Sequence, residues 1–289
     1  MMNRILFFVL LLLLMTSCKK KKETNTHNKG EITLQYDDAY INIAEALVHQ
    51  YGATYQDTKI NLKVSKEDQA LEDLLNKKVD AIIMSRELNE KEREYWDIKT
   101  KLPWQPSYFA ADAVCFVVHQ SSKKKFISLK EIKETLISEK KFIFEGYNTS
   151  NFNAVMQKLN LSPKEMKFYK VDGNKEIIKE VKKYPNRIGV VSYNTISNSH
   201  SKKINSLKEN IKILPIKVGD ILIYPNKESL KSQEYPLTKL LYFLTNEPKF
   251  GLANGLIRYS CTSIGQKIVG REGLQPFFIY PRTIKINQE

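Results

Sequence analysis

Short apolar runs alternate with amphipathic segments along the chain from residue 31 onward. Some runs have the two-residue alternation or the continuous apolar character of strands, and the segments between them repeat apolar residues at helical spacing. The sequence predicts strands at residues 32–36, 59–64, 79–84, 113–118, 141–144, 168–171 and 187–193. It predicts a helix opened by Asp37 and Asp38, with Asp38 placed to cap it, and further helices at residues 70–75, 129–137, 152–159 and 175–183. This order is typical of the α/β class, in which a mostly parallel sheet is covered by helices on both faces.

The pattern divides into two α/β units, and the second unit starts near Gln120. After turn signals at Pro215 and Pro225, we expect a helical C-terminal third from Leu237 onward. Two units of similar size predict two lobes with a cleft between them. Bilobal α/β enzymes share this pattern, so the fold alone leaves both an enzyme and a binding protein open.

The first 18 residues differ from the rest of the chain. Arg4 precedes an apolar core of about 11 residues, whereas a membrane-spanning helix needs roughly 20, so residues 1–17 have the form of a signal peptide. Thr16 and Ser17 are small and precede Cys18, so the segment resembles a bacterial lipobox. We therefore expect a lipoprotein with palmitate on Cys18 and a polar tether over residues 18–30. The alternative is an ordinary secretory signal or an uncleaved anchor.

The chain has 289 residues and a formal net charge of +14, which raises the question of nucleic acid as a partner. The lysines are spread along the chain, apart from residues 19–22 and 123–125, and no zinc-finger spacing or aromatic-basic motif is present. We expect no nucleic-acid binding. A positive field instead favours anionic lipid headgroups near the tether and small anions in a cleft.

The residue types that carry catalysis or bind metals show no recognisable spacing. No nucleophile elbow, P-loop, dinucleotide-binding glycine motif or zinc-protease motif is present, so we expect no enzyme, catalytic residue, cofactor or metal. Once Cys18 carries lipid, Cys115 and Cys261 remain, and two buried free thiols are expected, with a disulfide left open. The four histidines lack metal-ligand spacing to one another or to cysteine: His27, His49, His119 and His200.

Polar residues follow three of the expected strands, at the end of a sheet where open α/β proteins bind ligands. Hydroxyls and backbone amides at helix starts, together with one arginine, suit an oxyanion. In the alternative interpretation these residues are helix caps, and the arginine forms a surface ion pair with Glu87 or Glu90. The candidate ligand-binding residues are Asp37, Asp38, Ala39, Ser85, Arg86, Asn148, Thr149 and Ser150.

Two C-terminal stretches carry a more specific signal. Residues 235–242 and 264–276 match the pattern YPLxRxxY … GQxIxxxxGLxP closely, and residues 85–88, 110–113 and 188–193 support it. In these stretches the chain resembles the phosphate-binding (PstS-like) substrate-binding proteins of ABC transporters, in a divergent Bacteroidetes-type lipoprotein branch. The resemblance covers about residues 32–283. It implies the type II periplasmic-binding fold, with two α/β lobes joined by a two-strand hinge. The first lobe combines residues 31–118 and 222–289, and the second is 119–221.

The same resemblance implies a function. The family's phosphate ligands correspond to the eight candidate residues named above, with Arg86 as the main charge partner. The first loop carries two carboxylates, and Phe144 and Glu145 stand near the place of the family's second-lobe arginine. Both departures oppose a dianion.

The expected function is therefore a lipid-anchored, monomeric solute-binding protein of an ABC importer. It would bind phosphate or a related oxyanion, work with an ABC permease and sit on the periplasmic side of the cell envelope, with the cell surface left as the alternative location. The alternative is a binding-fold lipoprotein that has lost phosphate and acts through protein contacts or another ligand.

Overall fold

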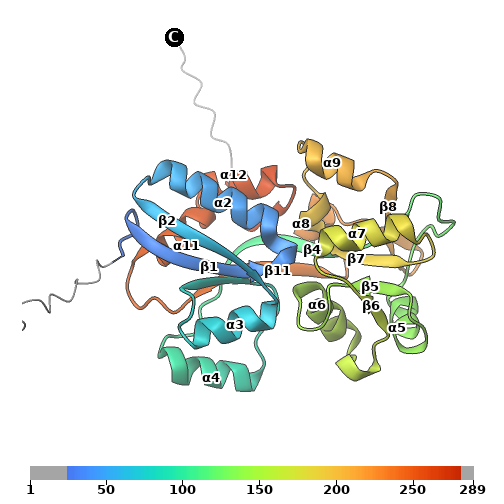
Figure 1. Ribbon diagram of the computed structural model, residues 1–289, viewed down its shortest axis with the longest axis horizontal. Helices are drawn as coiled ribbons and strands as arrows, with labels where there is room; N and C mark the ends of the chain where they lie inside the picture. Colours follow the sequence, from blue (N-terminus) through green and yellow to red (C-terminus); the bar gives the residue numbers. More distant parts are fainter. Residues whose placement is uncertain (1–24, 281–289) are drawn as a thin grey trace, which may run out of the picture.

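The computed structural model describes residues 25–280 and shows two α/β lobes side by side, linked by long central strands (Figure 1). Up to the crossing point, the elements are β1 (Gly30–Asp37), the short 3-10 helix η1 (Asp38–Tyr40), α2 (Ile41–Thr54), β2 (Thr58–Ser65), α3 (Glu67–Leu75), β3 (Ala81–Met84), α4 (Glu90–Thr100) and β4 (Ser107–His119). Between residues 25 and 280, no helix is both long enough and apolar enough to cross a membrane.

The second half of the chain completes both lobes. Its first elements are α5 (Leu129–Ser138), β5 (Phe142–Phe144), α6 (Ser150–Leu159), the 3-10 helix η2 (Pro163–Glu165), β6 (Phe168–Lys170), α7 (Asn174–Lys183), β7 (Ile188–Ser192), α8 (Tyr193–Ile196) and α9 (Lys202–Lys208). They are followed by β8 (Ile211–Leu214), β9 (Ile216–Val218), β10 (Ile221–Ile223), α10 (Lys227–Lys231), β11 (Thr238–Thr245), α11 (Leu252–Cys261), α12 (Ser263–Arg271) and β12 (Gln275–Pro276).

One sheet runs through both lobes, with strand order β2-β1-β3-β11-β4-β7-β5-β6, and β8 and β12 also pair with β4. Its two outer parts are parallel, because β1 pairs with β2 and β3, and β5 pairs with β6 and β7. Its centre is antiparallel, because β11 lies between β3 and β4 and β4 also pairs with β7. The expected parallel sheet is therefore found in each lobe, but the strands that join the lobes run antiparallel.

The apolar core follows this division. One cluster, which we call the second-lobe core, runs from Ala111 to Leu237, while the first lobe has two clusters drawn from residues 32–110 and 241–274. β4 serves both lobes, since Phe109 belongs to a first-lobe cluster and Val114 to the second-lobe core. The lobe limits expected at 118/119 and 221/222 stay a prediction. The second-lobe core extends past both of them.

Residues 238–245 differ from the expected helical C-terminal third. They form β11, which is inserted between β3 and β4 and buried along most of its length. A central position in the sheet favours the run Leu-Leu-Tyr-Phe-Leu as a strand, because it packs on both faces. The helices expected in this region begin only at Leu252. The strand expected at 113–118 starts earlier, at Ser107, because β11 and β12 both pair with its first half.

The start of the described chain also differs from expectation. The carbonyl of His27 accepts a hydrogen bond from the Tyr51 hydroxyl of α2, and its ring lies 5.8 Å from that of Phe250. Residues 25–29 therefore rest on the first lobe, although we expected a solvated tether up to residue 30. The signal peptide and Cys18 lie outside the described residues. Cys115 and Cys261 are both free thiols, and Cys115 is buried as expected, whereas Cys261 is only partly buried.

Candidate functional site

The two lobes meet at the carboxyl end of β1, where the Asp37 side chain is fully buried. Its carboxylate accepts four hydrogen bonds, from the amides of Ala39 (3.1 Å), Glu67 (3.2 Å) and Ser150 (3.1 Å) and from the Ser150 hydroxyl (3.1 Å). Ser150 opens α6 in the second lobe, so Asp37 receives donors from both lobes. Amides at a helix start form a ready site for an anion. In this structure the anion is a side chain of the protein itself.

A second buried carboxylate, Glu67, lies beside Asp37. It opens α3 directly after β2 and accepts hydrogen bonds from the Ser85 amide (2.7 Å), the Ser85 hydroxyl (2.8 Å) and the Asn153 side chain (3.0 Å). Asn153 belongs to α6, so this carboxylate also joins the lobes. Glu67 was not among the sequence candidates. Its position at the end of a strand was the signal that would have found it.

Arg86 lies at the edge of this site and is 8% exposed. Its guanidinium donates to Asp68 (2.9 Å) and, through two nitrogens, to Glu92 (2.8 and 2.7 Å). Burial alone would lower the pKa of Arg86, but the hydrogen bonds to Glu92 and the charge of Asp68 raise this pKa above its usual value. The positive charge is therefore compensated inside the protein. The acids that pair with it are not the expected Glu87 or Glu90, because the turn before α4 carries Glu92 back toward the arginine.

Asp38 reaches across to the second lobe. Its Oδ2 accepts hydrogen bonds from the Asn174 amide (2.7 Å) and side chain (3.0 Å) at the start of α7. It does not cap its own helix as expected, because a 3-10 turn separates it from α2 and Asp37 is the residue that caps that turn. Asp38 instead serves as the cap of α7, whose own N-cap residue is a glycine without a side chain.

The remaining candidates lie around the start of α6. Thr149 is buried, but its hydroxyl donates to the Gly146 carbonyl (3.2 Å) rather than to Asp37. Asn148 has a left-handed backbone (φ 64°), and its carbonyl accepts the Asp68 amide at 3.3 Å. The structure thus brings Asp37, Ala39 and Ser150 into direct contact. Whether any of the eight candidates holds a ligand stays a prediction.

A buried lysine lies at the hinge behind this site. Lys239 of β11 is 3% exposed, and its Nζ is 3.2 Å from Asp112 Oδ2, 2.9 Å from Asn151 Oδ1 and 3.5 Å from Ser150 Oγ. Asp112 is its register partner on β4 and also accepts the Asn194 amide (3.0 Å). Lys239 stands at the arginine position of the YPLxRxxY pattern, which was the available sequence signal.

The electrostatics of the site are set by buried acids. Burial, together with the nearby charge of Glu67, raises the pKa of Asp37 to about 7. Burial and the charge of Asp37 also raise the pKa of Glu145, which stands near the place of the family's arginine. Glu145 Oε1 accepts the Asn174 side-chain amide, and its Oε2 has no hydrogen-bond partner in the described part of the chain. Within residues 25–280, no three or more His, Cys, Asp or Glu side chains are grouped as metal ligands.

A cavity of about 320 Å³ opens beside the site, on the α6 side. Its lining includes Ser85, Arg86 and Lys239, together with Ala154, Gln157 and Lys158 of α6. A molecule in this cavity would lie next to Ser85 and to the three basic residues Arg86, Lys158 and Lys239. The arrangement suits a small anion more than a metal ion, provided that Asp37 and Glu67 leave donors for it.

Comparison with known proteins agrees with this architecture. The profile of the PBP superfamily domain matches residues 21–263. A Clostridium perfringens structure with bound phosphate, described as a candidate phosphate ABC transporter substrate-binding protein, has a TM-score of 0.71 at 13% identity and covers 86% of this chain and 100% of its own.

Two further structures have the same fold. PstS from Borrelia burgdorferi has a TM-score of 0.55 at 20% identity, over 86% of this chain and 99% of its own. An ABC-type phosphate transport receptor from Vibrio cholerae has a TM-score of 0.64 at 13% identity, over 84% and 99%. A search of curated proteins found no match. At these identities the likeness shows the fold. With its two lobes, its shared central strands and the match over most of its length, this chain belongs to the PBP superfamily and has the fold of periplasmic binding proteins.

Proposed function

We propose that this chain is a lipid-anchored binding protein of the cell envelope in which Asp37 occupies the oxyanion position between the lobes. The supporting observation is the set of four donors on the Asp37 carboxylate, which come from both lobes. A phosphate held there would compete with a built-in anion and would lie beside Glu67. With the Asp37 carboxylate in the oxyanion position, the protein works through protein contacts or through a ligand other than phosphate.

A second candidate function is favoured by the same donors. Turned away from the site, Asp37 would leave the Ala39 amide and the Ser150 amide and hydroxyl for an oxyanion, with Lys239 nearby. The Clostridium perfringens structure of this fold was determined with phosphate bound. In this alternative the two lobes close on phosphate or a related oxyanion, as the lobes of binding proteins close on their ligands. The chain then delivers the ligand to an ABC permease.

Thermal unfolding with and without phosphate separates the two functions. If the wild type binds phosphate, ligand at 100 times its dissociation constant adds about 2.7 kcal/mol of stability, which shifts Tm by several degrees. We expect no shift of the wild type at millimolar phosphate or sulfate. A shift of several degrees at micromolar phosphate would select the importer function.

The variant Asp37→Ala tests the internal-anion proposal directly. It removes the carboxylate and leaves the amides and the Ser150 hydroxyl as free donors. We expect millimolar formate or phosphate to raise Tm of Asp37→Ala and not Tm of the wild type. The control Asp220→Ala changes a fully exposed acid and should behave like the wild type. Equal responses of all three proteins would contradict the proposal.

The anchor is tested independently of the ligand. We expect Cys18→Ala to abolish metabolic labelling by palmitate and to release the exported chain from the membrane fraction. Unchanged membrane partitioning of this variant would mean that the apolar segment before Cys18 anchors the protein without lipid.

A further inference from the structure

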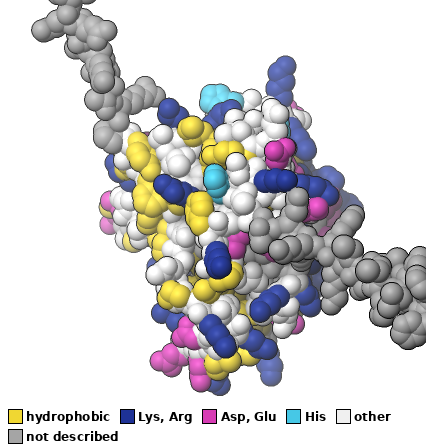
Figure 2. All heavy atoms as spheres, turned by 90° about the vertical axis from the view of Figure 1, so that its left-hand side faces the viewer, with side chains coloured by type: hydrophobic (Ala, Val, Ile, Leu, Met, Phe, Trp, Pro, Cys, Tyr) yellow, Lys and Arg dark blue, Asp and Glu magenta, His cyan; other side chains and the backbone are white. Residues whose placement is uncertain are grey.

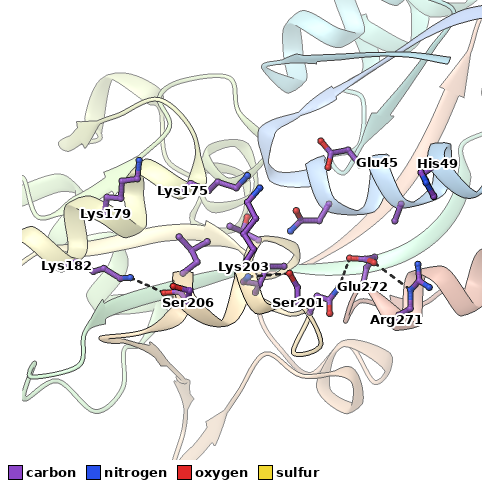
Figure 3. A pocket seen from close by; sticks show the side chains of 16 residues that line it. Glu45, His49, Lys175, Lys179, Lys182, Ser201, Lys203, Ser206, Arg271 and Glu272 are labelled. Atoms are coloured by element: carbon purple, nitrogen blue, oxygen red, sulfur yellow. Dashed lines mark hydrogen bonds and ion pairs between the residues drawn. The ribbon is translucent and has the colours of Figure 1, made fainter. Parts of the chain in front are cut away.

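A larger hollow lies between the lobes on another side of the molecule, next to α2 and α7 (Figure 3). Its volume is about 890 Å³, within the range of about 300–1,000 Å³ typical of small-molecule sites. Its walls come from α2 and the end of α12 in the first lobe and from α7, α8 and α9 in the second. We call this hollow the basic groove, because its charged lining residues are Lys175, Lys179, Lys182, Lys203, Arg271, Glu45 and Glu272.

Five cationic side chains therefore face the groove against two carboxylates. Lys175, Lys179 and Lys182 follow one face of α7 at intervals of four and three residues, which places them about 6 and 10 Å along the helix from the first. Lys203 comes from α9, and Figure 3 shows it in the middle of the groove, pointing toward the space between Lys175 and Glu45. The cations thus line the groove along its length.

Two of these cations have no partner among the residues that the structure describes. Lys182 donates to the Ser206 carbonyl (3.4 Å), Lys179 pairs with Glu176 (2.5 Å) and Arg271 lies 4.0 Å from Glu272. Lys175 and Lys203 form no side-chain hydrogen bond or ion pair with any residue in the described range 25–280. At the outer end of the first lobe, in contrast, the Lys and Arg side chains are scattered among other residues and do not gather around a hollow (Figure 2). Gathering like charges around one hollow opposes folding, and a bound anion would relieve the repulsion.

We propose that the basic groove is a second binding site, for a small anion that carries two or more phosphate or carboxylate groups. The volume of this open groove fits a small molecule, and the row of lysines fits separate anionic groups a few ångströms apart. The site shares no lining residue with the Asp37 site, so the inference goes beyond the proposed function and does not depend on it. Because both lobes supply cations, the ligand would also hold the lobes together.

Calorimetric titration of the lipid-free mature protein with tripolyphosphate, and separately with citrate, tests this site. We expect one anion to bind per chain, and we expect 0.15 M NaCl to raise the dissociation constant only moderately. The double variant Lys175→Gln/Lys203→Gln should raise the dissociation constant about tenfold, because each lysine loses its ion pair with the bound anion and the two small losses of binding free energy add. The two probes distinguish a phosphate preference from a carboxylate preference.

A matched control removes the same charge elsewhere. Lys130→Gln/Lys133→Gln changes two exposed lysines of α5 and should leave affinity within about twofold of the wild type. An equal loss in both double variants would show a net-charge effect and overturn the proposal. So would a failure of both small anions to bind while a long polyanion such as heparin binds. Binding that is lost in Ser150→Ala but kept in Lys175→Gln/Lys203→Gln would place the anion in the Asp37 site and also overturn it.

Discussion

Replacing Asp37 by Asn changes the charge of a fully buried acid in the interlobe site. The wild-type carboxylate accepts four hydrogen bonds and is fully buried. An Asn side chain keeps the shape but carries only one acceptor oxygen, so its NH₂ group faces amide donors. This loss is the same at every pH. The ionisation of Asp37, in contrast, gives a pH-dependent difference between the two proteins.

The magnitude follows from the pKa of Asp37, which burial and the charge of Glu67 raise from 3.8 to about 7. As pH rises above 3.8, the unfolded chain loses the proton first, and the folded chain keeps it until about pH 7. The folded state therefore binds more protons in this window, and the free energy of unfolding falls as pH rises. At 1.36 kcal/mol for each pKa unit, Asp37 accounts for a fall of about 2 to 3 kcal/mol between pH 5 and 8.

Urea unfolding of wild type and Asp37→Asn at pH 5, 6, 7 and 8, in buffers without phosphate, measures this difference. Between pH 5 and 8, the free energy of unfolding should fall by about 2 to 3 kcal/mol more for the wild type than for the variant. The charge of Asp37 is one cause of the raised pKa of Glu145, so Asp37→Asn also reduces that shift, and this change acts in the same direction by making the fall in the variant smaller. Asp220→Asn, at a fully exposed position, should follow the wild-type curve. Parallel curves for wild type and Asp37→Asn would refute the reasoning.

Further variants test the hinge, the packing and the arginine. Lys239→Met should lower the free energy of unfolding by about 3 to 5 kcal/mol, because it leaves Asp112 charged and buried without its cation; an unchanged urea midpoint would contradict this. Gly189→Ala should cost about 1 to 3 kcal/mol, since its Cβ would meet three methyl groups within 2.7–2.9 Å, whereas Gly52→Ala in helix α2 meets nothing within 4 Å and should stabilise by roughly 0.5–1 kcal/mol in the same assay. Arg86→Ala should lower Tm even without any anion, because it separates two carboxylates from their shared cation; a loss of anion affinity with unchanged Tm would instead place Arg86 at the ligand.

The local elements were largely predictable from the sequence. Strands such as 59–64 and helices such as 129–137 are confirmed within a few residues by β2 and α5. The period-3.6 pattern of α5 reflects burial of one face, whereas none of the residues of β2 is buried despite its period-2 pattern. The strand at 238–245 was not predicted. Its continuous apolar run fits a buried helix as well as a strand, and only its place between β3 and β4 decides between them. The antiparallel centre of the sheet was missed for the same reason.

The candidate site shows the same division. The rule that ligands bind at the carboxyl ends of strands singled out Asp37 and Ser150, which the structure places at the interlobe contact; their role in ligand binding stays a prediction. It did not predict that one would bind the other. Ser150 lies 113 residues beyond Asp37 in the sequence, and no local pattern carries information on such a pair.

The sequence by itself determined the α/β class, most element positions and the resemblance to phosphate-binding proteins, because these depend on residue periodicity and on short motifs. The tertiary structure decided how the charges are used. In the folded protein, Asp37 accepts hydrogen bonds from the start of α6, and Arg86 forms ion pairs with Asp68 and Glu92. Lys239 pairs with Asp112. It also gathered the lysines of α7 and α9 around one groove. The physical reason is that hydrogen bonds and charge pairing depend on distances of a few ångströms, and the crossing of the chain between the lobes sets those distances.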